Sequence, residues 1–297
     1  MPDIVKALHS GRVLLMDGAM GTELMRAGVI AEDLGRWFGL ARGMEKVTAV
    51  HRSYVEVGAH VLLTNSFLAG AQHMSWSMKA SCVGGAIIAR QNAGPERFVL
   101  LDSGPISDDH IRKRTGSLVL AAQEHQCDGI LMETCSTIAD ASAVLAARQR
   151  KEIDPECMPV LLSWTFRREA DGSLSTMTTH SPERCAKLAV KHGVAALGVN
   201  CGRAIAMPDI LEIIRCYRSV TDLPLFVRPN AGTPKQIDGQ WVYPETPESM
   251  AAWLPALFEA GVVMVGGCCG TTPAHIAAFR KVVDAWNSSH GLSDSEL

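Results

Sequence analysis

Short apolar runs alternate with amphipathic stretches along the whole chain of 297 residues. Short runs in which nearly every residue is apolar are typical of parallel strands that are buried on both faces. Eight such runs occur, at Val13–Met16, Val61–Thr64, Phe98–Leu101, Ile130–Met132, Val160–Ser163, Ala196–Val199, Leu225–Arg228 and Val262–Val265. The pattern therefore predicts eight buried strands.

Helical periodicity fills the intervals between these runs. Apolar residues recur three and four positions apart, as on the buried face of a helix, at Met44–Val57, Ile138–Arg148, Pro208–Tyr217 and Pro247–Glu259. A hydroxyl residue followed by proline, which suits the start of a helix, stands at Ser181, Thr246 and Thr272. Eight βα units in a chain of this length predict a (β/α)8 barrel that forms a single domain over residues 1–297. A doubly wound open sheet is the weaker alternative.

Two irregular segments and the C-terminal end depart from the alternation. The segments Phe166–Thr178 and Ala231–Tyr243 contain Asp-Gly dipeptides at 171–172 and 238–239, which favour hairpin turns. Each segment follows a predicted strand, so both hairpins are expected at the C-terminal rim of the barrel. The residues from Asn287 onward are rich in serine and acidic residues and are predicted to form a short frayed tail.

Composition narrows the possible functions. A formal charge of −3 argues against a surface for nucleic acid. Nine cysteines, an odd number without a secreted-protein framework, indicate a reducing compartment. Neither a signal peptide nor an apolar stretch long enough to cross a bilayer is evident in the sequence. We therefore expect a cytoplasmic enzyme without a membrane or nucleic-acid partner.

Three cysteines stand directly after two of the predicted strands. Cys201 follows the sixth strand, and the adjacent pair Cys268 and Cys269 follows the eighth. Adjacent cysteines bond each other only with strain, whereas the loops after barrel strands converge on one face. Three thiolates there could hold a zinc ion and leave its fourth position open, which indicates catalysis. A phosphate-binding loop at 266–267 is a weaker alternative, and Cys135 is expected to pack in the interior, as are the remaining cysteines.

Other polar residues also follow predicted strands. Asp17 and Gly18 come after the first strand, Asn65 after the second and Glu133 after the fourth. In a barrel all of them would lie on the face that bears the cysteines. They are therefore candidates for binding a substrate beside the metal.

Five motifs in order give the chain a family resemblance. They are Asp-Gly-Ala-Met-Gly-Thr-Glu at 17–23, Thr-Asn-Ser-Phe at 64–67, Glu-Thr at 133–134, Gly-Val-Asn-Cys at 198–201 and Gly-Gly-Cys-Cys-Gly-Thr-Thr-Pro at 266–273. The chain thereby resembles the homocysteine S-methyltransferases, which transfer a methyl group onto a zinc-bound thiol. The resemblance places zinc on Cys201, Cys268 and Cys269. It places homocysteine on Asp17 and Glu133, with Gly18 at a backbone contact.

The methyl donor is the remaining question. Trp37 resembles a tryptophan of the enzymes that use betaine or S-methylmethionine, and an indole face stabilises such an onium cation. Segments 229–232 and 243–248 resemble the homocysteine module of cobalamin-dependent methionine synthase. The expected substrates are homocysteine and an onium donor. A separate corrinoid protein as donor is the alternative, and a zinc-holding protein that captures a thiol without turnover is a hypothesis from another class.

Overall fold

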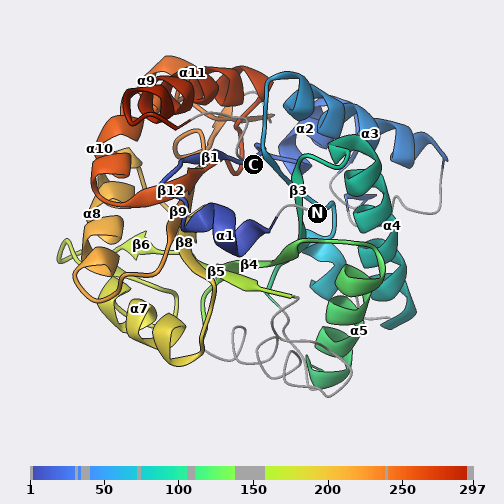
Figure 1. Cartoon of the computed structure of the whole chain (residues 1–297), viewed down its shortest axis with the longest axis horizontal. Coiled ribbons are helices and arrows are strands. Elements are labelled where there is room, and N and C mark those ends of the chain that lie inside the picture. Colours follow the sequence, from blue (N-terminus) through green and yellow to red (C-terminus); the bar gives the residue numbers. More distant parts are fainter. Residues whose placement is uncertain are drawn as a thin grey trace.

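The computed structural model describes residues 3–30, 33–34, 41–71, 75–105, 111–137, 158–237 and 240–292. Eight parallel strands form one sheet, in which neighbours in space follow one another along the chain (Figure 1). They are β1 (Leu14–Leu15), β2 (Val61–Leu63), β3 (Phe98–Ser103), β4 (Gly129–Cys135), β5 (Val160–Trp164), β8 (Ala196–Asn200), β9 (Leu225–Arg228) and β12 (Val262–Val265). Each of the eight predicted strands is therefore present.

The two strands at the ends of this spatial order, β1 and β2, also meet, so the sheet closes. Met16 and Val61 form a parallel bridge. The N–H of Asp17 donates to the carbonyl of Val61 at 2.9 Å, and the N–H of His60 donates to the carbonyl of Leu15 at 2.7 Å. The architecture is the predicted (β/α)8 barrel, and the open-sheet alternative is wrong.

Helices surround the barrel (Figure 1). They are α2 (Gly21–Arg26), α3 (Ala41–Glu56), the 3-10 helix η3 (Phe67–Ala71), α4 (Ser75–Ala93), α5 (Ile111–Glu124), α7 (Pro182–Lys191), α8 (Met207–Arg218), α9 (Pro247–Ala251), α10 (Leu254–Glu259) and α11 (Pro273–Ser289). The predicted helices 44–57 and 208–217 are confirmed as α3 and α8. The predicted helix 138–148 lies outside the described residues.

The prediction of one helix over 247–259 is wrong, because the structure has two, α9 and α10. Pro255 has no N–H, so it cannot donate to the carbonyl of Ala251 as a continuous helix requires. The chain instead tightens at Trp253, whose N–H donates to Met250 three residues back at 3.1 Å.

A short helix, α1 (Ile4–Leu8), closes the N-terminal mouth of the barrel. Asp3 caps this helix, because its carboxylate accepts from the N–H of Val5 at 2.9 Å. Ile4 and Leu8 join the cluster of side chains that fills the barrel interior, which includes Leu14 and Phe226. A second and larger apolar cluster lies between the strands and the outer helices. With one mouth filled by apolar residues, polar chemistry is left to the C-terminal mouth.

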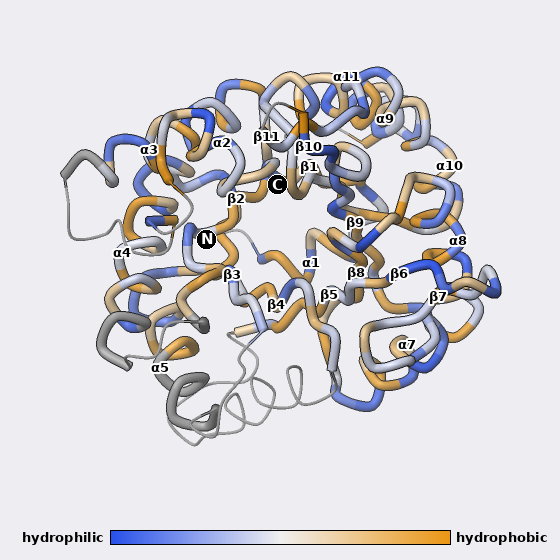
Figure 2. The backbone as a smooth tube through the Cα atoms, turned by 180° about the vertical axis from the view of Figure 1, so that it is seen from behind, coloured by the Kyte–Doolittle hydropathy of each residue, from blue (hydrophilic) through white to orange (hydrophobic). Residues whose placement is uncertain are grey.

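Both predicted hairpins are present on that rim. The first pairs β6 (Arg167–Arg168) with β7 (Leu174–Ser175), and Gly172 in its turn has φ of 85°. The second pairs β10 (Lys235–Ile237) with β11 (Gln240–Val242); its turn at 238–239 lies outside the described residues. Figure 2 shows β6 as hydrophilic, in contrast to the largely hydrophobic barrel strands.

The predicted start of the frayed tail at Asn287 is wrong, because α11 continues to Ser289 and Asn287 is 3% exposed. Its side-chain amide donates to the carbonyl of Val13 at 2.9 Å and accepts from the N–H of Val13 at 2.9 Å. One amide thus satisfies both backbone groups of the residue before β1, which the local polarity of the sequence does not reveal. Residues 293–297 lie outside the described part of the chain.

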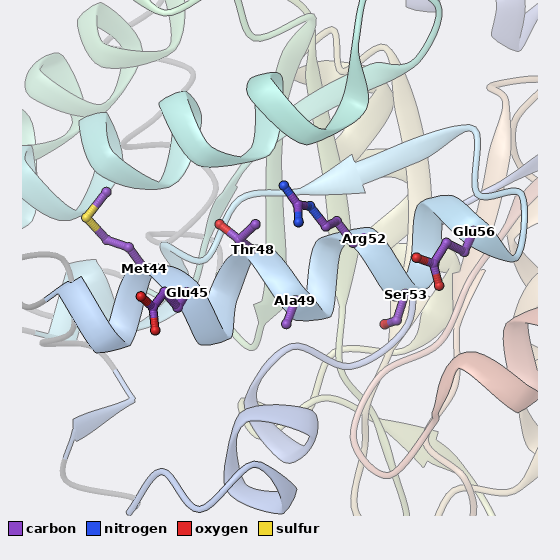
Figure 3. Close-up of a pocket in the computed structure, with 7 residues that line it drawn as sticks. All are labelled: Met44, Glu45, Thr48, Ala49, Arg52, Ser53 and Glu56. Atoms are coloured by element: carbon purple, nitrogen blue, oxygen red, sulfur yellow. The ribbon is translucent and has the colours of Figure 1, made fainter.

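A broad hollow of about 660 Å³ lies along α3 on the outer surface (Figure 3). Its lining residues all belong to that helix: Met44, Glu45, Thr48, Ala49, Arg52, Ser53 and Glu56. None of the candidate site residues that the structure describes borders it. Across the described part of the chain, no helix is both long and apolar enough to span a membrane.

Candidate metal centre and substrate pocket

The three predicted ligand cysteines meet at the C-terminal mouth. Cys201 directly follows β8, and Cys268 and Cys269 follow β12 by a short loop. Their Sγ atoms all lie within 4.8 Å of one another, and those of Cys268 and Cys269 are 4.0 Å apart. Thiolates bound tetrahedrally to zinc at about 2.3 Å would have sulfurs about 3.8 Å apart. The donor set and its spacing therefore fit zinc.

Backbone hydrogen bonds hold the cysteine loops against the segment after β9. The N–H of Cys268 donates to the carbonyl of Pro229 at 2.8 Å, and the N–H of Ala231 donates to the carbonyl of Cys269 at 2.9 Å. Gly267 is needed for this packing, since a Cβ there would lie 2.2 Å from Oγ1 of Thr271. Close packing thus accounts for Gly267, which the alternative interpretation of the sequence placed in a phosphate-binding loop.

Neighbouring donors favour the thiolate form of Cys201. Asn230 Nδ2 donates to Sγ of Cys201 at 3.5 Å, and Asn200 Nδ2 lies 4.0 Å from Sγ of Cys268. Hydrogen bonds from Cys268 and Cys269 lower the pKa of Cys201. The same bond to Cys201 raises the pKa of Cys268.

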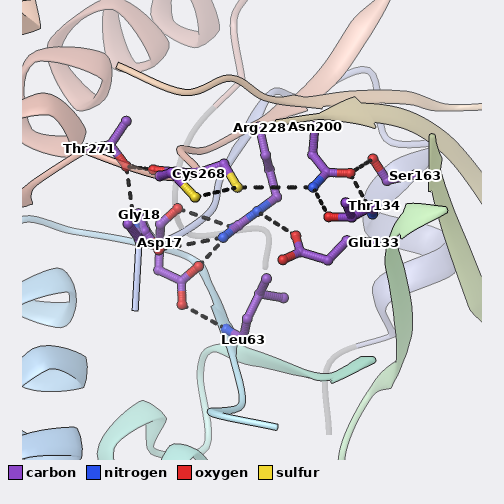
Figure 4. Close-up of polar contacts among 12 residues, drawn as sticks. Asp17, Gly18, Leu63, Glu133, Thr134, Ser163, Asn200, Arg228, Cys268 and Thr271 are labelled. Carbon is purple, nitrogen blue, oxygen red and sulfur yellow. Dashed lines mark hydrogen bonds and ion pairs between the residues drawn. The ribbon is translucent and has the colours of Figure 1, made fainter. Parts of the chain in front are cut away.

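Asn200 connects the cysteine cluster with Thr134, near the end of β4 (Figure 4). Its Oδ1 accepts from the N–H of Thr134 at 2.9 Å and from the hydroxyl of Ser163 at 2.6 Å, and its Nδ2 donates to Oγ1 of Thr134 at 2.8 Å. Thr134 and Cys201 both have left-handed backbones, with φ of 60° and 53°. Non-glycine residues in this region cost free energy and cluster at functional sites. The buried Asn200 side chain holds the strained residue Thr134 in place.

Two predicted carboxylates lie on either side of a buried arginine (Figure 4). Arg228, the last residue of β9, donates through Nη1 to Oδ1 of Asp17 at 2.9 Å, and its Nε lies 3.5 Å from Oε2 of Glu133. Oδ2 of Asp17 accepts from the N–H of Leu63 at 2.8 Å. Burial raises the pKa of Asp17, against the charge of Arg228. Burial likewise raises the pKa of Glu133, to about 7.

Four polar atoms of residues in or just after the barrel strands are buried without a hydrogen-bond partner. They are Asn65 Nδ2, Asp102 Oδ1, Glu133 Oε2 and Arg228 Nε. Asp102, near the end of β3, is buried, and its pKa is raised well above the usual value by burial and by the charge of Glu133. Glu133 Oε2 and Arg228 Nε lie 3.5 Å apart as an ion pair. Buried polar groups are normally paired, so Asp102 Oδ1 and Asn65 Nδ2 are the atoms that indicate a place where a ligand binds.

The other residues considered from the sequence lie as follows. A Cβ on Gly18 would lie 2.7 Å from the hydroxyl oxygen of Tyr54, so the backbone passes too close for a side chain. Trp37 lies outside the described residues. Cys135 is buried in the interior, and no other described group of cysteine, histidine and acidic residues gathers three ligand atoms as Cys201, Cys268 and Cys269 do. His275 instead faces Thr272 and the carbonyl of Glu245.

Three residues of the site were not assigned a role from the sequence: Asp102, Asn200 and Arg228. Each is the polar end of a run otherwise rich in apolar residues, as in Val-Leu-Leu-Asp and Leu-Phe-Val-Arg. In a parallel barrel such a position faces the C-terminal mouth. A charged residue that ends a buried strand is the signal that could have identified Asp102 and Arg228.

Comparisons with known proteins agree with this geometry. The chain is 30% identical over 302 residues to the methionine synthase of Mycobacterium tuberculosis, covering 92% of this chain and 25% of that protein. It is 26% identical over 306 residues to the homocysteine S-methyltransferase of Escherichia coli, covering 90% of this chain and 94% of that protein. The chain thus spans about a quarter of the length of the methionine synthase.

Solved structures give the same relationship. The apo form of the homocysteine methyltransferase MmuM from Escherichia coli superimposes with a TM-score of 0.71 at 25% identity, covering 93% of this chain and 97% of that one. Its metallated form gives the same TM-score and identity, covering 93% of this chain and 98% of that one. The sequence model of the family described as homocysteine S-methyltransferase matches residues 14–283, and the chain belongs to this family.

Proposed function

We propose that the protein transfers a methyl group from a small onium donor, of the betaine or S-methylmethionine type, to the thiolate of homocysteine, giving methionine. Family membership supports methyl transfer to homocysteine. The observation that supports this site most directly is the group of three Sγ atoms within 4.8 Å, next to buried carboxylates. Cys201, Cys268 and Cys269 would hold zinc. When bound, zinc would keep the acceptor sulfur as a nucleophilic thiolate at neutral pH.

The chain's own residues position the acceptor. Glu133 offers an oxygen without a hydrogen-bond partner, and a carboxylate can accept more than one hydrogen bond per oxygen, so Asp17 retains capacity as well. Both would contact the substrate's ammonium group, with Gly18 at a backbone contact and Asn65 beside them. Holding the sulfur in line with the methyl carbon can lower the barrier by about 7–11 kcal/mol at best.

The transfer itself needs no base at the methyl carbon. The sulfur lone pair forms the new S–C bond while the donor's C–N or C–S bond breaks and its electrons remain on the donor. The donor becomes a neutral amine or thioether, and the acceptor's thiol proton has already left to solvent. Because the donor loses its positive charge in this step, an aromatic pocket that binds the cation without water suits the reaction.

A second candidate is methyl transfer from a separate corrinoid protein. The similarity to a methionine synthase over a quarter of its length favours it. A donor screen separates the candidates: zinc-loaded protein and homocysteine are incubated with betaine, S-methylmethionine or a methylated corrinoid protein, and methionine is detected by mass spectrometry. Methionine from an onium compound supports the proposal, and methionine from the corrinoid protein alone refutes the onium donor. Homocysteine binding without methionine from any of these donors would identify a thiol-binding protein.

Trp37 is the residue proposed to face the onium donor. Changing Trp37 to Ala should reduce donor use far more than homocysteine binding, and Trp37→Phe should retain part of the activity because phenyl is a weaker cation partner than indole. Trp241, which is 59% exposed on β11, provides the control variant Trp241→Ala. Equal donor kinetics in Trp37→Ala and the control would exclude this role.

A further inference from the structure

A turn in the backbone brings the adjacent ligand candidates Cys268 and Cys269 to the same side of the chain. Successive side chains of an extended chain point to opposite faces, yet these two Sγ atoms lie 4.0 Å apart. The N–H of Thr271 donates to the carbonyl of Cys268 at 3.1 Å, which closes a four-residue turn. Gly270 stands third in this turn with φ of 82°, a left-handed conformation that glycine adopts without strain. The turn therefore lets two neighbouring residues offer sulfur to one ion.

The hydroxyl of Thr271 connects this turn with the segment after β1. It donates to the same carbonyl of Cys268 at 2.7 Å (Figure 4), and it accepts from the N–H of Ala19 at 3.1 Å. Only a group that both donates and accepts can serve these two partners. Thr271 is fully buried, so neither partner would gain a bond to bulk water if the hydroxyl were removed.

Two further hydroxyls support the same junction. Oγ1 of Thr22 accepts from the N–H of Gly270 at 3.1 Å. The buried hydroxyl of Tyr54, on α3, donates to the carbonyl of Ala19 at 2.9 Å. Ala19 is thus held from both sides, by Tyr54 and by Thr271. The cysteine turn is consequently attached to the segment 17–22, which is itself attached to an outer helix.

We propose that Thr271 is a positioning residue for the metal centre: its hydroxyl, supported by that of Thr22, fixes the orientation of the Cys268–Cys269 turn toward Cys201. The inference rests on the proposed function, because it concerns the zinc that these three cysteines would hold. Thr271 does not itself bind the ion. Without its hydroxyl the turn would still close through the backbone, but zinc binding would have to order its direction. Losing a supporting contact of this kind typically weakens metal binding by about 10- to 100-fold.

Zinc affinity, measured by competition with a chromophoric chelator and without homocysteine or a methyl donor, tests the assignment. Thr271→Val keeps the shape of the side chain and removes the hydroxyl, so it should weaken zinc binding by roughly 10- to 100-fold. Thr271→Ser restores a hydroxyl and should recover most of the loss. Thr22→Val removes the second connection and should weaken zinc binding by a smaller factor, because both bonds to the carbonyl of Cys268 remain.

Cobalt(II) in place of zinc adds a readout of geometry, since its visible absorption depends on the tetrahedral arrangement of the thiolates around it. Thr271→Val should change this spectrum, and Thr271→Ser should retain it. Thr176→Val is the matched control, because Thr176 is also fully buried and its Oγ1 accepts from the N–H of His180 at 3.2 Å. This control should lower the stability of the fold and leave zinc affinity and the cobalt spectrum unchanged.

Wild-type zinc affinity and cobalt spectrum in Thr271→Val would overturn the inference, and so would equal losses in Thr271→Val and Thr271→Ser. If Thr271→Val does not fold, Thr22→Val decides, and unchanged zinc affinity in that variant would overturn the inference. If the wild-type protein binds no zinc, the proposed function itself fails.

Discussion

At the scale of single residues, the metal proposal depends on sulfur atoms that stand in loops. Replacing Cys268 with alanine should abolish tight zinc binding, because two thiolates remain where three are needed, and should leave the barrel folded. Metal analysis after dialysis, together with circular dichroism, measures both effects. Cys216→Ala, on the outer helix α8, is the matched control. Full zinc retention in Cys268→Ala would refute the ligand assignment.

Glu133 should act on the substrate and not on the metal. Glu133→Gln keeps the size of the side chain and removes its charge, so zinc content should stay near wild type. Homocysteine affinity should fall by a free energy of about 1.5–3 kcal/mol, the value of a hydrogen bond to a charged group. Calorimetry and metal analysis on the same sample check the pair of results, and zinc loss with unchanged affinity would contradict the role.

The same carboxylate should make stability depend on pH in an unusual direction. Burial raises the pKa of Glu133 from 4.5 to about 7, so between these values the folded protein binds the proton more than the unfolded chain does. Stability from this group therefore falls as pH rises from 4.5 to about 7. Urea unfolding of substrate-free wild type and Glu133→Gln should differ by this slope. Parallel profiles for the two proteins would show that folding does not raise the pKa of Glu133.

At the scale of elements, α3 contains a histidine with no evident structural task. His51 is fully buried, and neither ring nitrogen has a hydrogen-bond partner. Burial lowers its pKa from 6.5 to about 4, so its stabilising neutral form is present above pH 6.5 and lost as pH falls toward 4. His51→Leu should stabilise the protein by about 1–3 kcal/mol, the usual cost of an unpaired buried polar group.

The gain from His51→Leu should be larger at pH 5 than at pH 7, since the wild type alone bears the protonation cost at the lower pH. Thermal unfolding at both values measures it. The exposed His9 gives the control variant His9→Leu, which should change stability little at either pH. A loss of stability in His51→Leu would instead indicate that the imidazole shape is required for packing.

Elements were predictable where a local pattern determines them. All eight barrel strands begin and end within three residues of the apolar runs, because burial on both faces leaves a continuous signal. The break between α9 and α10 is also local, since it lies at Pro255. The role of Asn287 was not predictable, because its partner Val13 is 274 residues away. The pairing of Arg228 with Asp17 likewise depends on how the barrel closes, which no local pattern records.

At the scale of the whole molecule, Asn287 fastens the last helix to the first strand. Asn287→Ala should leave the N–H and carbonyl of Val13 unpaired in a buried position and lower the free energy of unfolding by about 1–3 kcal/mol. Urea unfolding measures the change. Asn92→Ala, on the partly exposed face of α4, should cost less. If both variants lose the same free energy of unfolding, the hydrogen bonds to Val13 contribute no more than those of a partly exposed side chain.

This contact also fixes where a neighbouring module could be attached. Because α1 fills the N-terminal mouth and Asn287 binds the residue before β1, both ends of the described chain lie at the mouth opposite the cysteines. The 19-residue helix α4 alone is about 28 Å long at 1.5 Å per residue. A donor module fused to either end would have to reach the cysteines by a tether that runs along the side of the barrel. Such a tether would need on the order of ten extended residues to span this length. Tether length, and not affinity alone, would then set the rate of methyl delivery in any fused enzyme of this kind.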